Sequence, residues 1–137
     1  MRYSSFLVIP IVVCWASNTN AACVLSDYSV RSEFDRSFDI VVGTVVGERS
    51  IPKLNGRDEG VIYTVKLQDS FRGCVLPTFE LFSENSSGRF PMTKGMKYFL
   101  FIYDDGDILA VDSCGNSGLL TERQKELGAV RDLVRSK

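Results

Sequence analysis

The sequence contains no histidine among its 137 residues. This absence excludes the Ser-His-Asp and Cys-His nucleophile systems and removes a common ligand of catalytic zinc sites. A glycine-rich phosphate loop is also missing, and the segment Gly115-Asn116-Ser117-Gly118 lacks the spacing of a hydrolase nucleophile motif. We therefore expect a protein that is not an enzyme and that needs no cofactor or metal ion of its own.

The chain lacks an excess of charge of either sign. Lysine and arginine number 16 against 17 aspartate and glutamate, for a net charge of −1. The basic residues form no cluster, so the composition does not favour a nucleic-acid partner. Asp104, Asp105 and Asp107 lie close together, but they fall short of a calcium-loop pattern, which needs further oxygen ligands and a distant glutamate. We interpret them as a solvated hairpin turn.

Long hydrophobic runs are absent as well. The apolar run at residues 6–16 is shorter than the roughly 20 residues that a membrane-spanning helix needs. It follows the positive charge of Arg2 and precedes a polar stretch at 17–20 that leads to Ala21 and Ala22. A charged start, a short apolar core and small residues at the end are typical of a cleavable export signal. A buried N-terminal helix is the alternative interpretation.

The export signal sets the boundaries of the mature protein. We predict a signal peptide over residues 1–22 and one domain over residues 23–137, in a secreted or periplasmic location. Cleavage after Ala22 makes Cys23 the first residue, whereas cleavage one residue earlier leaves Ala22 first. A lipid anchor at Cys23 is a further alternative, although Asn20 stands where lipoprotein signals usually carry leucine.

Three cysteines remain after the signal peptide: Cys23, Cys74 and Cys114. In an oxidising compartment a disulfide between two of them is the default expectation. Sequence alone leaves all three pairings open, namely Cys23–Cys114, Cys23–Cys74 and Cys74–Cys114. The odd number leaves one thiol unpaired or available to link two chains. A reactive thiol at Cys74 is less favoured than a disulfide or a buried residue, because little besides Arg72 is near to activate it.

The middle of the chain is rich in short segments with strand patterns. Residues 61–67 alternate between apolar and polar side chains, as a half-buried strand does. Residues 96–103 are apolar on both faces, which predicts the most buried strand. An Asp-Gly turn follows it and favours a tight hairpin. The five predicted strands cover residues 40–47, 61–67, 78–83, 96–103 and 108–113, with a charged loop over 48–60.

Helical patterns flank these strands. Apolar residues four positions apart predict a short helix over residues 30–38. Thr121 with Gln124 fits a capping box at the start of a second helix over residues 121–136. We therefore predict a mainly β fold, a five-stranded OB-like barrel with a short N-terminal helix and a C-terminal helix. The face of the second helix that we expect to pack inward consists of Leu127, Val130, Leu133 and Val134.

Several segments in the same order resemble the netrin-like domain found in tissue inhibitors of metalloproteinases and their bacterial relatives. Phe38–Val46 resembles the first strand of that domain, and Ser113-Cys114-Gly115 resembles its second cysteine motif. The likeness extends over nearly all of residues 23–118. The other matching segments are 63–65, 71–73 and 94–101.

The resemblance implies an OB-like barrel and one mechanism. In the animal inhibitors an N-terminal cysteine is tied to the barrel by a disulfide, and its α-amine and carbonyl oxygen chelate the catalytic zinc of a protease. In this chain Cys23 would be the chelating residue, Val24 would enter the specificity pocket of the protease, and Cys114 or Cys74 would be the anchor. The chain departs from the animal pattern at Leu25, where those inhibitors carry a second cysteine.

The predicted function is therefore that of a secreted protein-binding module, acting as a metalloprotease inhibitor through Cys23. The alternative is an envelope lipoprotein or a sugar-binding OB-like barrel without inhibitory activity. In the sugar-binding alternative the aromatic side chains of the fourth strand would stack on the ligand, although their pattern favours the core. These side chains are Tyr98, Phe99, Phe101 and Tyr103.

Overall fold

The computed structural model describes residues 23, 27–53 and 59–137, so the predicted signal peptide lies outside the described residues. The predicted elements appear in the predicted order, and a short sixth strand is added before the last helix. The elements are α1 (Val30–Arg36), β1 (Asp39–Ile51), β2 (Gly60–Arg72), β3 (Thr78–Glu84), β4 (Lys97–Asp104), β5 (Leu109–Val111), β6 (Gly118–Leu119) and α2 (Gln124–Arg135).

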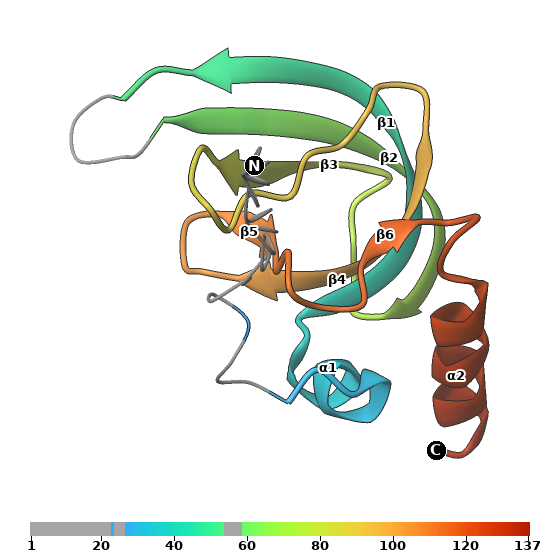
Figure 1. The fold of residues 1–137 in the computed structure, drawn as a ribbon. Helices are drawn as coiled ribbons and strands as arrows, with labels where there is room; N and C mark the ends of the chain where they lie inside the picture. Colours follow the sequence, from blue (N-terminus) through green and yellow to red (C-terminus); the bar gives the residue numbers. More distant parts are fainter. Residues whose placement is uncertain (1–22, 24–26, 54–58) are drawn as a thin grey trace, which may run out of the picture.

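Five of the strands close into a barrel (Figure 1). Their order is β1-β2-β3-β5-β4, and antiparallel pairing of β4 with β1 closes the ring. The pairing of β3 with β5 is parallel, whereas the other pairs are antiparallel, so the barrel is mixed. The predicted mainly β, OB-like barrel with a helix on either side of the strands in sequence is thereby confirmed.

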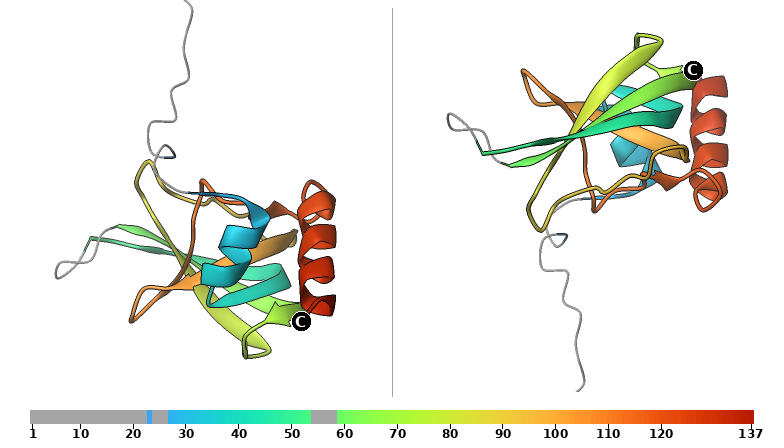
Figure 2. Two further views of the ribbon diagram at one scale, coloured as in Figure 1. Left: turned by 90° about the horizontal axis from the view of Figure 1, so that it is seen from below. Right: turned by 90° about the horizontal axis from the view of Figure 1, so that it is seen from above.

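The apolar residues of β1 and β4 face two separate cores, because successive side chains of a strand point to opposite sides. Val41, Leu100 and Ile102 point into the barrel interior. Phe99 and Phe101 point outward and are covered by both helices, which pack against the barrel from outside (Figure 2). This double burial confirms β4 as the strand that is buried on both faces. The outer core consists of Phe34, Ile40, Val42, Phe99, Phe101, Leu127 and Val130.

The first hairpin is longer than predicted. The expected loop over 48–60 is wrong at its start, since β1 continues through Ile51 and pairs there with Gly60 at the beginning of β2. Glu48 pairs with Tyr63 within this extension. The extension is mostly polar because these strand ends project beyond the core. Backbone pairing with β2 and an ion pair from Arg49 to Glu80 at 3.3 Å hold these residues in the strand, so a hydrophobic pattern cannot reveal them.

The predicted start of the last helix is also wrong. The helix α2 begins at Gln124, and within the described residues its N-cap Arg123 makes no capping hydrogen bond through its side chain. The Gln124 side chain instead donates to the carbonyl oxygen of Leu120. Leu127 is buried as expected, but Val134 is 42% exposed. The residues expected to form its first turn lie instead in a turn that follows β6, in which the Leu119 carbonyl oxygen accepts the backbone N–H groups of Glu122 and Arg123.

The chain turns sharply on both sides of β5. Gly106 adopts a φ of +81°, which confirms the predicted turn after β4. The strand β5 is shorter than the predicted 108–113, because Asp112 lies in a turn in which its Oδ1 accepts the backbone N–H of Cys114 at 2.9 Å. This turn brings Cys114 to the edge of the barrel where the N-terminal segment arrives.

Candidate functional site

A disulfide joins Cys23 to Cys114 across 91 positions of sequence, with their Cα atoms 5.5 Å apart. Both pairings that involve Cys74 are therefore wrong, and Cys74 carries an exposed free thiol. The reason is the path of the chain. Cys74 follows β2 at the end of the barrel where β1 begins, since Arg72 pairs with Ile40. Cys114 lies instead beside residues 27–29, the segment directly before α1, where Tyr28 contacts Asp112 and Asn116.

Side chains from that segment bind the turn that carries Cys114. The Tyr28 hydroxyl donates to Oδ2 of Asp112 at 3.1 Å, while Oδ1 of Asp112 accepts the Cys114 backbone N–H. The Asn116 side chain donates to the Tyr28 carbonyl oxygen at 2.6 Å. The chain on either side of Cys114 is thus tied to a residue only a few positions after Cys23.

A buried carboxylate from α1 completes this set of bonds. Glu33 has no exposed surface, and its two oxygens accept three hydrogen bonds. The donors are the Tyr103 hydroxyl at 2.9 Å, the Asn116 backbone N–H at 2.7 Å and the Asn116 side-chain amide at 2.7 Å. A buried carboxylate is tolerated when donors of this kind surround it. We call Tyr28, Glu33, Asp112 and Asn116 the edge network.

Cationic and aromatic groups surround the edge network. The Arg36 guanidinium lies 5.3 Å from the centre of the Tyr28 ring and 6.0 Å from that of Tyr103. Burial opposes the charge of Arg36, but its hydrogen bond to Tyr103 and the charge of Glu33 raise its pKa. Burial also raises the pKa of the Tyr103 hydroxyl. Tyr103 therefore keeps its proton near neutral pH, and its hydroxyl can donate a hydrogen bond to Glu33.

A shallow groove of about 370 Å³ lies beside the edge network. Ala110 and Val111 give it apolar surface, and Arg36 lies at its edge. Asp104 lines it too, and one of its oxygens accepts the Gly106 backbone N–H, as expected for a hairpin turn. Within residue 23 and the ranges 27–53 and 59–137, no three acidic or cysteine side chains gather where they could hold a metal ion.

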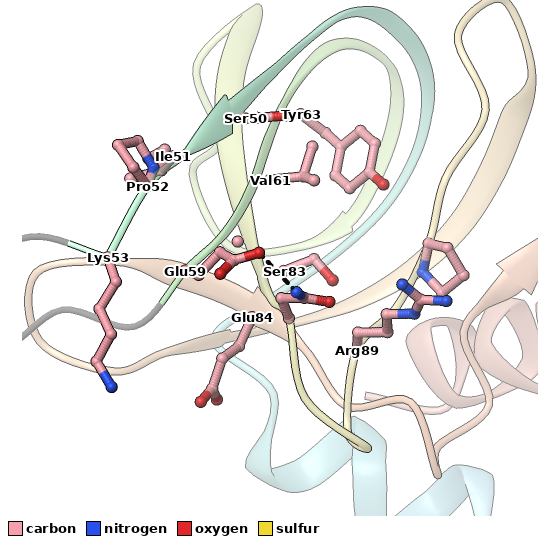
Figure 3. Close-up of a pocket in the computed structure, with 13 residues that line it drawn as sticks. Ser50, Ile51, Pro52, Lys53, Glu59, Val61, Tyr63, Ser83, Glu84 and Arg89 are labelled. Atoms are coloured by element: carbon pink, nitrogen blue, oxygen red, sulfur yellow. Dashed lines mark hydrogen bonds between the residues drawn. The ribbon is translucent and has the colours of Figure 1, made fainter.

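A larger groove of about 480 Å³ lies at the end of the β1–β2 hairpin where Ile51 pairs with Gly60 (Figure 3). The Tyr63 ring points into it, with Arg89 on the far side from Lys53. Its polar wall is fixed by a hydrogen bond of 2.8 Å from the Asn85 side chain to the Glu59 carboxylate. Sequence patterns did not indicate this groove, because its residues come from segments that only the barrel brings together.

The remaining predicted site residues have different outcomes. Val24 lies outside the described residues. Tyr98, Phe99 and Phe101 are at most 5% exposed, so they form core and are not available to stack on a sugar. Tyr103 is half-buried and bound to Glu33 through its hydroxyl.

Sequence reasoning missed the residues that hold the edge together, above all Glu33 and Asn116. One signal for Glu33 existed. It lies three positions after Val30 and therefore shares the apolar face that Val30 and Phe34 form in the predicted helix, which turns this acid toward the protein. A lone acid near an apolar face does not reveal its partner, however, and Asn116 comes from a segment 83 positions away.

Within the described part of the chain, no helix has both the length and the apolar character needed to cross a membrane. Comparison with known proteins adds no relative: no protein-family model matches this chain, and no curated protein matches it. The candidate function therefore depends on the geometry of the edge around Cys23.

Proposed function

We propose that this chain is exported, begins at Cys23 once residues 1–22 are removed, and acts as a netrin-like protein-binding module that inhibits a zinc metalloprotease. The observation that supports this most directly is the disulfide from Cys23 to Cys114. It fastens the proposed first residue to the wall of a closed barrel. The edge network fixes the other half of the disulfide, so the anchor itself is held.

The chemistry of a free N-terminal cysteine suits a zinc ion. An α-amine has a pKa of about 8, so it can lose its proton to a metal near neutral pH. Catalytic zinc sites keep one coordination position open for water or substrate. The α-amine and the carbonyl oxygen of Cys23 would replace the bound water and make the zinc five-coordinate, and Val24 would enter the adjoining specificity pocket. Fixing Cys23 in advance lowers the entropic cost of binding.

The test compares two forms of the chain that differ only at the N-terminus. One begins at Cys23, and the other carries one added alanine before it. We expect the first form to inhibit members of a panel of zinc metalloproteases and the extended form to lose at least a hundredfold in potency, because its α-amine is displaced. An alanine added after Lys137 is the matched control and should leave inhibition unchanged. Equal inhibition by both N-terminal forms would exclude the zinc-chelating mechanism.

A sugar ligand is the second candidate, and the larger groove favours it. Ser50, Ser83 and Asn85 line this groove with hydroxyl and amide groups, which suit a hydroxyl-rich ligand, whereas the Tyr63 ring is only 5% exposed and belongs to the core. OB-type barrels bind oligosaccharides as one of their recurring uses. A glycan screen with the chain 23–137 tests this candidate, and an Arg89→Ala variant should weaken any binding found. A screen without binding would remove it.

A further inference from the structure

Through its side chain, Glu33 joins α1 to β4 and to the segment after Cys114. Its carboxylate is fully buried and accepts from Tyr103 in β4 and from both the backbone and the side chain of Asn116. Gly115 passes so close that a Cβ atom there would collide with the carboxylate. The backbone next to Cys114 thus packs directly against the Glu33 carboxylate, which only a glycine at position 115 permits.

We propose that Glu33 is a positioning residue for the Cys23–Cys114 disulfide. By holding the backbone of Gly115 and Asn116, it keeps Cys114 facing the chain that leads from Cys23, whether or not the sulfur atoms are bonded. This inference rests on the proposed function in one respect: a fixed Cys23 matters for activity if the chain inhibits a protease through its N-terminus. The contacts of Glu33 stand independently of any partner.

The physical consequence is a disulfide that resists reduction. When the folded dithiol form already holds one cysteine in place, the effective concentration of one thiol at the other is high. A high effective concentration favours the disulfide in exchange with a small thiol. Without the bonds from Glu33, the segment carrying Cys114 gains freedom in the reduced form, and the disulfide becomes easier to reduce.

The measurement is the equilibrium between the Cys23–Cys114 disulfide and glutathione. Two reduced glutathione molecules supply two electrons and two protons, so the protein S–S bond breaks, both cysteines become thiols, and one glutathione disulfide forms. All variants carry Cys74→Ser, because the free thiol would otherwise form mixed disulfides. Trapping the thiols and measuring intact mass gives the fraction reduced at each glutathione ratio.

Glu33→Gln keeps the size of the side chain but places an amide N–H₂ group among donors. We expect its disulfide to be reduced at least tenfold more readily than in the parent, a shift of about 30 mV for a two-electron couple. Asn116→Ala is the second variant, since it removes the side-chain amide that donates to Glu33 and to the Tyr28 carbonyl oxygen, and leaves the carboxylate with the Tyr103 hydroxyl and the backbone N–H of residue 116 as donors. It should shift the equilibrium in the same direction by at least threefold, even where Glu33→Gln does not fold.

Val65→Ala is the matched control for a general loss of stability. Val65 is fully buried in the barrel interior and belongs to the core on the opposite side of the wall from α1. Its truncation should lower the free energy of unfolding and leave the exchange constant of the folded protein within twofold of the parent. An equal shift in Val65→Ala and Glu33→Gln would overturn the proposal.

The proposal is also overturned when Glu33→Gln, if folded, and Asn116→Ala both stay within twofold of the parent. Because no protease takes part in this experiment, its result is independent of the inhibition assay. Shifted exchange constants in a protein that inhibits nothing would support the role of Glu33 and remove the proposed function. Inhibition that depends on the N-terminus, with unchanged exchange constants, would do the reverse.

Discussion

Removing the Cys23–Cys114 disulfide should cost this domain much of its stability. The bond closes a loop of 91 positions, which contains every strand of the barrel. For a loop of this length the chain-entropy relation gives about 4.6 kcal/mol at 25 °C, because the bond restricts the unfolded chain far more than the folded one. A domain of this size is typically stable by only about 5–15 kcal/mol. The double variant Cys23→Ser, Cys114→Ser should therefore be marginally folded.

Urea denaturation followed by circular dichroism measures the loss. With a typical slope of roughly 1–3 kcal/mol per molar urea, the midpoint should fall by roughly 1.5–4.6 M. The matched control is Cys74→Ser, which changes the exposed free cysteine and should alter the free energy of unfolding by no more than about 0.5 kcal/mol. Intact mass with thiol trapping confirms that the disulfide is present in the parent.

A loss below about 1 kcal/mol with the disulfide shown to be present would refute this reasoning. It would mean that the unfolded chain is already restrained by residual structure, or that the bond strains the folded barrel by nearly as much as it restricts the unfolded chain. Measuring the slope separates these two explanations, since residual structure in the unfolded chain lowers the slope and native-state strain does not.

Three further predictions concern the outer core and the end of the barrel where β1 begins. Phe99 is fully buried and its ring centre lies 6.1 Å from that of Phe71, so Phe99→Ala should cost about 3–5 kcal/mol in urea denaturation, and a loss under about 1 kcal/mol would contradict its place in the core. Gly73 has a φ of +86° and its missing Cβ leaves room for the Asp39 carboxylate, so Gly73→Ala should lower the melting temperature, while Gly95→Ala, at a similar φ with open space around it, should lower it less. Burial raises the pKa of the Asp39 carboxyl, although a hydrogen bond from the Cys74 backbone N–H lowers it in part. The folded state therefore favours the protonated acid. The contribution of Asp39 to stability is greatest below the unfolded-state pKa and is lost as pH rises through the folded-state pKa. Asp39→Asn should therefore gain stability relative to the parent between pH 3 and pH 7, and a difference that does not change with pH would rule this out.

Side-chain patterns were sufficient to predict the fold class. The alternation of residues 61–67 and the doubly apolar run at 96–103 indicated which strands face the core, and both interpretations were confirmed. Such patterns report burial, so they could not reveal the polar extension of β1, which is held by backbone hydrogen bonds to β2. For the same reason the two-residue strand β6 escaped prediction.

The candidate site was predictable only in part. Counting cysteines showed that one of the three must remain outside an intramolecular disulfide, but it could not select which one. Glu33 and Asn116 were not recognised, because a hydrogen bond between residues 83 positions apart leaves no periodic trace in a sequence.

By itself the sequence excluded histidine-dependent active sites, and it determined the order of the elements and which faces of the central strands are buried. These properties depend on neighbours in the chain, where side-chain size, branching and polarity act over a few residues. The tertiary structure decided that Cys23 pairs with Cys114, that Cys74 stays free, and that a buried carboxylate from α1 holds the turn beside the disulfide. These properties depend on which distant segments meet when β4 pairs with β1 and the barrel closes.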